Sequence, residues 1–483
     1  MVKETYLISI LILAAFGLSE SSKCKVDRQN LWDDYSVRNS YDRVVCTNVN
    51  FRFLSTYQPE LQSYQILTIA NSSLPSLPRN LHLPSTLKEL VMSNLSIATI
   101  PSETFNNLQY LQELDLSSNN LRHIQPGVFQ LEQLKVLRLS RNLLSHINPN
   151  SFIHLRNLKE LYLDQNSLRS IEPSFFNNLQ NLEVFNISSN PLHSFPDVKF
   201  TYLKSFLASN TYLRRIQADL TADRFWRINI SNSHLEEIDF RHFHSVALDL
   251  SNNSINVVKN WNKLKVHYLY LSWNDIEDLG EIAQNVTYLY LAHNRIRFLG
   301  QVFSHRKNIQ TLDLSFNRIS EINSVTFAGL KNLTTLYLQG NMINVLQQNL
   351  FINCANLKYL DLSFNRIRMI EPNAFNGAHR LSRLNISNND LQSLNFTILS
   401  KVKLLTDLSF NNNRISKIDL DQFTHNTPNL KSVALNKNDW DCDNIRNILH
   451  YLIDRNIKIT DQISFYGTTV SGISCKTHQR YYS

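Results

Sequence analysis

The side chains that recur in a chemically suggestive pattern are aromatic. Tyr268 and Tyr270 stand two residues apart, and the pair returns at Tyr288 and Tyr290. Rings and carboxylates bind partners by stacking, cation–π contact and hydrogen bonding. We call the whole group the aromatic field and predict that it contacts a partner. Its members are Tyr268, Tyr270, Trp273, Tyr288, Tyr290, His293, Asp313, Phe316, Tyr337, Tyr359, Asp361 and Phe364.

Motifs of catalysis are missing from the sequence. There is no HExxH, GxSxG or CxxC motif, and neither GxGxxG nor GxxxxGK[ST]. Only 9 of the 483 residues are glycine, so the chain offers no glycine-rich loop to cradle a phosphate. The 15 histidines are scattered, and His293 is better explained as a ring of the aromatic field than as a base or ligand. We therefore expect no enzyme activity, no cofactor and no metal.

Composition points to a folded chain that does not bind nucleic acid. Hydrophobic residues make up 43% and charged residues 18%, which is enough apolar surface to form a core. The net charge of +8 is spread along the chain without a block of five like charges. Such a spread favours a solubilising surface over a nucleic-acid footprint.

An internal repeat of the form LxxLxLxxNxL organises the chain. Clear copies begin at Leu111, Leu158 and Leu357, and an apolar residue follows thirteen positions after each start in all turns before the last. This pattern predicts a leucine-rich repeat solenoid of class α/β, a horseshoe with a long parallel sheet on its concave face. The turns begin at residues 64, 87, 111, 134, 158, 182, 203, 225, 245, 266, 286, 309, 333, 357, 381, 405 and 430.

Each position of the repeat has a physical reason. The central LxL is a short strand whose leucines point into the core while their neighbours face solvent. The Asn at the ninth position is expected to hydrogen-bond the backbone of adjacent turns, because buried amides without partners are costly. It is replaced in four turns, by Ser72, Leu95, Thr211 and Ser233. No turn buries enough apolar surface to fold alone, so stacking is obligatory.

Residues 1–19 have the pattern of a signal peptide. Lys3 precedes an apolar run from Leu7 to Leu18, and small residues follow near Ser19. The run is shorter than the roughly 20 apolar residues that span a bilayer. We expect a secreted, extracellular protein without a membrane span.

The five cysteines fit an oxidising compartment. Four lie near the ends of the chain, and we pair Cys24 with Cys46 and Cys442 with Cys475. Cys354 is left over, at a repeat position that other turns fill with a buried leucine. A buried free thiol is the favoured interpretation, and an intermolecular disulfide remains the alternative.

A solenoid exposes its core at both ends and needs caps there. We expect an N-terminal hairpin cap over residues 20–63, a solenoid of about 17 turns over 64–440, and a C-terminal cap with a short tail over 441–483. After Cys442, apolar residues at helical spacing predict an amphipathic helix. The common extracellular cap has a second cysteine where this chain has Asn444.

At these residues the chain resembles the mosquito leucine-rich immune proteins. The matching features are the single cysteine pair in the N-terminal cap, the sequence SNNSINVV (251–258) within short central turns, and the closing NDWDC (438–442) followed by a helix. The resemblance implies a secreted immune protein whose partner is a complement-like thioester protein, another leucine-rich repeat protein or a pathogen-surface molecule. The chain is similar to the coil-less type, because no heptads follow Cys475.

The third, fifth, seventh and eighth residues of each turn face the concave side, and the aromatic field occupies these positions in five successive turns. Two interpretations stay open. The patch is either a partner-binding surface or a set of cross-strand aromatic ladders that stabilise the sheet.

Nine N-x-[ST] sequons are candidate glycosylation sites in a secreted chain. Three of them, Asn186, Asn229 and Asn385, occupy the fifth, concave position of their turns, on both flanks of the aromatic field and not inside it. Glycans there would leave the field open. The sequons begin at Asn71, Asn94, Asn186, Asn229, Asn252, Asn285, Asn332, Asn385 and Asn395.

The sequence therefore favours a secreted, non-catalytic recognition or adaptor protein of innate immunity. The alternative is an adhesion or receptor-ectodomain-like module that acts at the cell surface through a membrane partner. Presence in body fluid after infection favours the first hypothesis, and constant association with membranes favours the second.

Overall fold

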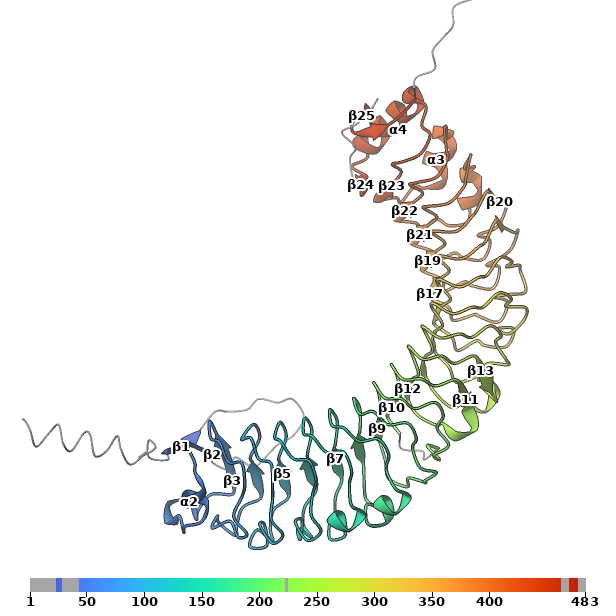
Figure 1. Ribbon diagram of the computed structural model, residues 1–483. Helices are drawn as coiled ribbons and strands as arrows, with labels where there is room; N and C mark the ends of the chain where they lie inside the picture. Colours follow the sequence, from blue (N-terminus) through green and yellow to red (C-terminus); the bar gives the residue numbers. More distant parts are fainter. Residues whose placement is uncertain (1–22, 28–42, 222–224, 462–468, 477–483) are drawn as a thin grey trace, which may run out of the picture. The chain divides into compact units, whose positions relative to one another are not determined.

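The computed structural model describes residues 23–27, 43–221, 225–461 and 469–476. The predicted signal peptide, residues 1–19, lies outside the described residues. The chain divides into two compact units, Met1–Ser233 and His234–Ser483. In each unit short parallel strands line one side, and turns and short helices line the other (Figure 1).

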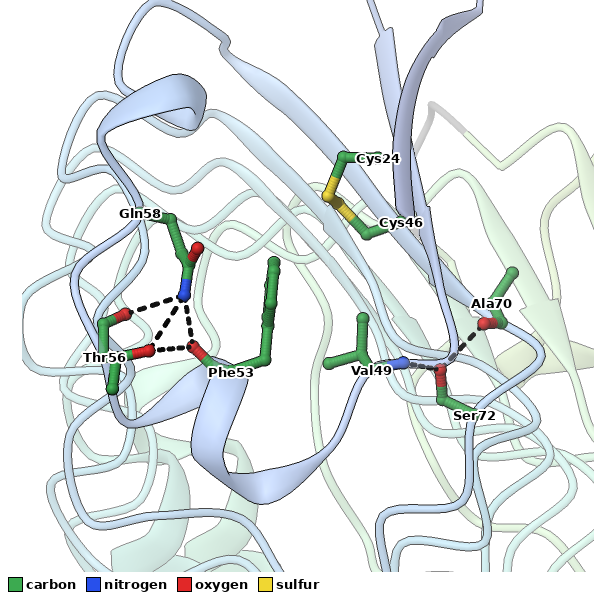
Figure 2. The surroundings of a disulfide bond; sticks show 8 residues. All are labelled: Cys24, Cys46, Val49, Phe53, Thr56, Gln58, Ala70 and Ser72. Carbon is green, nitrogen blue, oxygen red and sulfur yellow. Dashed lines mark hydrogen bonds between the residues drawn. A yellow bond between two sulfur atoms is a disulfide. The ribbon is translucent and has the colours of Figure 1, made fainter. Parts of the chain in front are cut away.

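The first unit begins with a disulfide-linked hairpin. Strand β1 (Lys23–Asp27) pairs antiparallel with β2 (Arg43–Thr47), and Cys24 is bonded to Cys46 (Figure 2). β2 then pairs in parallel with β3 (Ile66–Ala70), so the hairpin covers the first edge of the sheet. A short helix, α2 (Phe51–Leu54), begins at Asn50, whose side chain accepts a hydrogen bond from the Phe53 amide.

The remaining strands of the first unit follow at one strand per turn, each paired in parallel with its predecessor. In most of them the middle residue is buried and its neighbours are half-buried, as the alternation in the repeat requires. These strands are β4 (Glu89–Val91), β5 (Glu113–Asp115), β6 (Val136–Arg138), β7 (Glu160–Tyr162), β8 (Val184–Asn186), β9 (Ser205–Leu207) and β10 (Arg227–Asn229).

The second unit repeats this arrangement without a shift in register. Leu269, Leu289, Leu312, Leu336 and Leu360 pair in succession and are fully buried. Its strands are β12 (Ala247–Asp249), β14 (Tyr268–Tyr270), β15 (Tyr288–Tyr290), β16 (Thr311–Asp313), β17 (Thr335–Tyr337), β19 (Tyr359–Asp361), β21 (Arg383–Asn385), β22 (Asp407–Ser409), β23 (Ser432–Ala434) and β24 (Lys458–Ile459).

The side opposite the sheet consists mostly of turns. In several of these turns Phe and Leu stand three residues apart, as Phe152 and Leu155 do, which matches the three residues per turn of a 3-10 helix. Two short parallel ladders also lie there, β11 (Glu237–Asp239) with β13 (Val257–Lys259) and β18 (Val345–Leu346) with β20 (Met369–Ile370). The helices are η1 (Pro59–Leu61), η2 (Pro149–Phe152), η3 (Pro173–Asn178), η4 (Phe240–His242), η5 (Trp261–Lys263), η6 (Phe396–Leu399) and α3 (Leu420–Asn426).

The ninth-position asparagines form the hydrogen-bonded ladder that the repeat predicts. Asn341, for example, accepts a hydrogen bond at Oδ1 from the Ile319 amide (3.0 Å). Its Nδ2 donates to the carbonyls of Leu314 (2.9 Å) and Leu338 (3.0 Å). The side chain thus bonds its own turn and the preceding one.

Hydroxyl groups replace the amide in three of the four exceptional turns. Ser72 Oγ accepts from the Val49 amide and donates to the Ala70 carbonyl (Figure 2). Thr211 Oγ1 donates a hydrogen bond to the Ala208 carbonyl, and Ser233 Oγ accepts one from the Thr211 amide (3.2 Å). Where Leu95 stands, Asn119 of the next turn accepts from the Leu95 and Ile97 amides at the same time.

The C-terminal cap is built around a buried tryptophan and a second disulfide. Trp440 is fully buried and donates from Nε1 to the Leu435 carbonyl (2.9 Å). Helix α4 (Cys442–Asp454) follows, and a bond from Cys442 to Cys475 joins its start to a small hairpin of β25 (Thr469–Val470) and β26 (Ile473–Ser474). Both predicted disulfides are confirmed.

Cys354 is a free, fully buried thiol, as its repeat position predicts. Burial raises the pKa of this thiol to about 12, so it stays protonated and inert. An intermolecular disulfide would require a thiol at the surface, and the structure therefore does not support that alternative.

We predict that Asn341→Ala destabilises the solenoid by about 1–3 kcal/mol, because it leaves the buried Ile319 amide without its acceptor and removes one of two amide donors from the Leu314 and Leu338 carbonyls. The check is chemical denaturation of the purified protein. Asn356→Ala is the matched control, since the half-buried Asn356 donates to the Lys331 carbonyl and accepts from the Arg380 guanidinium, and both bonds are open to solvent. Equal midpoints for the two variants would contradict the assigned role of the ladder.

Candidate binding surface

The structure brings the aromatic field together on the sheet of the second unit. Its tyrosines occupy both ends of β14 and β15, the last position of β17 and the first position of β19, next to the buried leucine in the middle of each strand. Because the strands pair without a shift, residues with the same repeat position lie directly beside one another.

Parallel pairing stacks the tyrosine rings. The ring centroids of Tyr268 and Tyr288 are 4.5 Å apart with an angle of 3° between the planes. Tyr270 and Tyr290 stack in the same way, at 4.9 Å and 1°. The ladders that the sequence left as one alternative therefore exist. All four rings are half-buried, so the stacks still present part of their surface to solvent.

A third stack is formed by rings at the eighth position of successive turns. Trp273, His293 and Phe316 follow one another with centroid distances of 3.7 Å and 4.4 Å and nearly parallel planes. These rings are more open than the tyrosines: Trp273 keeps 57% of its surface exposed and Phe316 keeps 44%. Phe364, the next ring at this repeat position, is 60% exposed.

The backbone at this eighth position is left-handed in all seventeen turns. Eight of the turns place Asn or Gly there, and the φ angles lie between 46° for Asn71 and 71° for Gly340. Trp273, His293, Phe316 and Phe364 adopt the same conformation. For residues with bulky side chains it costs on the order of 1–2 kcal/mol each. Since every turn has this backbone, the conformation belongs to the repeat, and these turns differ in placing large rings where most others have Asn, Gly or Ser.

The sandwich around His293 affects its ionisation. Burial between neighbouring rings lowers the pKa of His293, and the carboxylate of Asp313 opposes this shift only in part. The imidazole is therefore held toward its neutral form, as a flat polar ring within an aromatic stack.

A tilted pair continues the field. Tyr337 and Tyr359 lie 5.3 Å apart at 57°, and the Arg383 guanidinium lies 4.7 Å from the Tyr359 ring centroid. Burial, together with Asp361, raises the pKa of Tyr359 to about 12. Its hydroxyl stays protonated and donates to Asp361 Oδ2 (3.1 Å).

The two carboxylates of the field differ in accessibility. Asp361 is only 8% exposed; it accepts from Ser363 at Oδ1 and from Tyr359 and Asn385 at Oδ2. Asp361 thus positions Tyr359 and offers little surface to a partner. Asp313 is half-buried and accepts from the Ser315 amide and hydroxyl.

Gly340 was missed by the sequence analysis. A Cβ atom there would lie 2.5 Å from Phe316 Cδ1, so the Phe316 ring occupies the space that a side chain would fill. The signal was present in the sequence, because Gly340 is the one glycine among the eighth-position residues. Its meaning required the left-handed backbone and the direction of the neighbouring ring.

The sequons fall into two structural groups. Six are exposed, whereas Asn186, Asn229 and Asn385 are half-buried strand residues. Nδ2 of Asn385 donates to Asp361 Oδ2, and Nδ2 of Asn186 donates to Asp164 Oδ1. Attachment of a glycan at either nitrogen would disturb these bonds. The exposed sequons are Asn71, Asn94, Asn252, Asn285, Asn332 and Asn395.

Within the described ranges, no cluster of three or more His, Cys, Asp or Glu side chains is suited to hold a metal ion. Across the same residues, no helix has the length and apolar character needed to cross a membrane.

Comparison with protein families identifies the repeat. A leucine rich repeat model matches residues 85–131, 109–168, 156–206, 284–343 and 332–391. The chain is a leucine-rich repeat solenoid.

The curated relatives match only short stretches of this solenoid. Leucine-rich repeat-containing G-protein coupled receptor 5 of Xenopus tropicalis is 41% identical over 68 residues, which are 14% of this chain and 7% of the receptor. Osteomodulin of Bos taurus is 36% identical over 75 residues, 16% of this chain and 17% of osteomodulin. The chain thus spans a small fraction of either relative.

Solved structures share the fold over most of the solenoid. The LRIM1/APL1C complex is 23% identical with a TM-score of 0.50, covering 92% of this chain and 70% of that one. YopM of Yersinia enterocolitica is 23% identical with a TM-score of 0.55, and the match covers 76% of this chain and 77% of YopM. A leucine-rich repeat protein of Leptospira interrogans is 20% identical with a TM-score of 0.54, and the match covers 80% of this chain and 94% of that protein. At these identities the likeness shows the fold alone.

We predict that Gly340→Ala destabilises the second unit more than Gly300→Ala does. Both glycines have positive φ, but a Cβ at Gly300 would meet nothing within 4 Å, whereas one at Gly340 would collide with Phe316. The shared cost of the left-handed backbone is about 1–2 kcal/mol, and displacement of Phe316 adds to it only at Gly340. Denaturation midpoints of the two variants measure the difference, and equal losses would refute the contact.

We predict that His293 makes the folded state sensitive to mild acid. Its folded pKa lies below the unfolded value of about 6.5. The contribution of His293 is therefore complete above pH 6.5 and is lost as the pH falls from there through the folded pKa. His293→Phe keeps a ring in the stack and removes the titration. Between pH 7 and pH 5 the wild type should lose more stability than this variant; parallel pH profiles would exclude the effect.

Proposed function

We propose that this chain is a secreted, non-catalytic recognition protein of innate immunity that binds a protein or pathogen-surface partner through the aromatic field. The observation that carries the proposal is the exposed stack of Trp273, His293 and Phe316 on a strained left-handed backbone. The tyrosine pairs stack on ordinary strand backbone, whereas these rings occupy a left-handed position that most other turns give to small or amide side chains.

Chemistry of the surface supports binding rather than catalysis. Rings, phenol hydroxyls and the Asp313 carboxylate are suited to pack against and hydrogen-bond a partner. Asp361, which would be the second open carboxylate, is occupied by Tyr359, Ser363 and Asn385. The field thus offers one open carboxylate, and not the pair of open carboxylates that one common form of acid–base catalysis uses.

Similarity to immune proteins supports the biological setting. The cap and central turns resemble the mosquito leucine-rich immune family, and the structure of LRIM1 with APL1C shares the fold. In that structure the two proteins form a complex. We propose another leucine-rich repeat protein as a partner of this chain, and the family resemblance adds a complement-like thioester protein as a second class of partner. The runner-up is a cell-surface adhesion or receptor-ectodomain-like module.

Position of the sequons agrees with an open binding face. No sequon begins at a residue of the aromatic field, and the nearest strand sequon on the C-terminal side is Asn385 in β21. We propose that several of the six exposed sequons carry glycans and that the field stays uncovered.

We predict that replacing Tyr270, Tyr290 and Tyr337 together with Ser abolishes partner capture while the protein stays folded. The three residues are half-buried at the edge of their strands, so the core leucines are untouched. The tagged protein is secreted, used to capture partners from the native body fluid, and the captured proteins are identified by mass spectrometry.

A matched control makes the same kind of change on the first unit, where Tyr162 occupies the corresponding strand position in β7. Tyr162→Ser should retain capture. If the triple variant is folded by circular dichroism and still captures the partner, the aromatic field is not the binding surface. A partner that is an integral membrane protein would favour the runner-up function.

A further inference from the structure

A second surface lies beside the aromatic field, formed by the eighth and tenth residues of the turns from 309 to 357. We call it the lateral edge; its members are Phe316, Arg318, Gly340, Met342, Phe364 and Arg366. Both phenylalanines are exposed, and Met342 retains 38% of its surface. An apolar strip of this kind on an otherwise polar side is a candidate contact surface.

Backbone hydrogen bonds hold the tenth residues in line. The amide of Arg318 donates to the Ile296 carbonyl, that of Met342 to Ile319 and that of Arg366 to Ile343, each at 2.9 Å. Every bond joins a tenth residue to the eleventh residue of the preceding turn. The two arginines are therefore two turns apart with Met342 between them.

The arginines at the tenth position of successive turns differ in whether an acidic side chain neutralises their charge. Arg295 forms an ion pair with Asp275 (2.6 Å), and Arg414 forms one with Asp390 (2.8 Å). Arg318 and Arg366 are exposed, and no ion pair of either is found in the part of the chain that the structure describes. Two open guanidinium groups thus flank the exposed Met342.

The distance between the two arginines restricts the backbone conformation of a segment that could contact both. Neighbouring strands are about 4.8 Å apart, so residues two turns apart are separated by about 10 Å. In a polyproline II segment, residues i and i+3 lie on the same side and are about 9.3 Å apart. Carboxylates at i and i+3 would therefore meet both arginines at once. A β-strand would not match, because its residues i and i+3 point to opposite faces.

We propose that the lateral edge binds an extended acidic protein segment of the form acidic-x-x-acidic, with apolar residues between the two carboxylates. The guanidinium groups of Arg318 and Arg366 bind the carboxylates, preferably with two hydrogen bonds each. The apolar residues of the segment pack on Met342 and on the rings of Phe316 and Phe364. Aromatic grooves commonly receive extended segments in this conformation.

This inference rests on the proposed function in one respect, since it assigns partner chemistry to rings that belong to the aromatic field. The two proposals are tested by different residues. The tyrosines of the strands test the concave surface, and the two arginines test the lateral edge.

The experiment measures binding of fluorescein-labelled synthetic peptides to the full-length secreted protein by fluorescence anisotropy. The first peptide carries two Glu residues three positions apart in a proline-rich background, with Leu between them. The second carries the same residues with the two Glu adjacent, and the third replaces both Glu with Lys. We expect the first peptide to bind at least about tenfold more tightly than the other two, because only it satisfies both arginines.

Charge reversal supplies the decisive variant. R318E/R366E should lose the first peptide and gain the Lys peptide. R380E/K401E makes the same change in net charge at exposed residues away from the lateral edge and should behave as the wild type. Thermal unfolding of both variants verifies that they are folded.

Several outcomes would overturn the proposal. These are equal binding of the two Glu peptides, preference of the wild type for the Lys peptide, or undiminished binding of the first peptide by R318E/R366E. The proposed function fails separately: a Tyr270, Tyr290 and Tyr337 triple variant that captures its partner normally rejects the concave surface, whatever the peptides do.

Discussion

Satisfaction of the backbone amides at the end of each strand is the constraint on which the rest of this structure depends. The chain leaves the sheet within three residues, so several amides of every turn are buried without a strand partner. In most turns a single side chain solves this problem by bonding the turn before it, as Asn341 does. Since every such bond runs to the adjacent turn, the register cannot slip, and each side chain lies beside its equivalent.

The stacked rings follow directly from that fixed register. The strand spacing of about 4.8 Å is close to the distance at which aromatic rings stack. Two tyrosines at equal positions therefore stack without adjustment, as Tyr268 and Tyr288 do. The eighth position behaves differently, because its left-handed backbone disfavours large side chains. At Trp273 and Phe316 the chain retains rings where most other turns have smaller or amide side chains. The same feature joins the concave field to the lateral edge, where Gly340 makes room for Phe316.

The period of the sequence was enough to predict much of this structure. Spacing of leucines determined the strands, the side that each residue faces and the burial of Cys354. Position along the chain was enough to pair the terminal cysteines. Other features depend on the directions in which side chains point, and the repeat pattern in the sequence does not contain that information. The burial of Asp361 arises from hydrogen bonds to Tyr359 and Asn385, and the role of Gly340 arises from the direction of one ring. The turns opposite the sheet are mostly 3-10 or irregular, because their apolar residues are three apart and not alternately three and four.

The C-terminal cap has a consequence for a change of redox environment. In place of the second cysteine of the common cap, Asn444 accepts from the Ile418 amide and donates to the Ile418 carbonyl, both at 3.0 Å. Thiols can open the bond between Cys442 and Cys475, but they have no effect on an amide. The junction between the last repeats and α4 therefore retains a clamp that reductants leave intact.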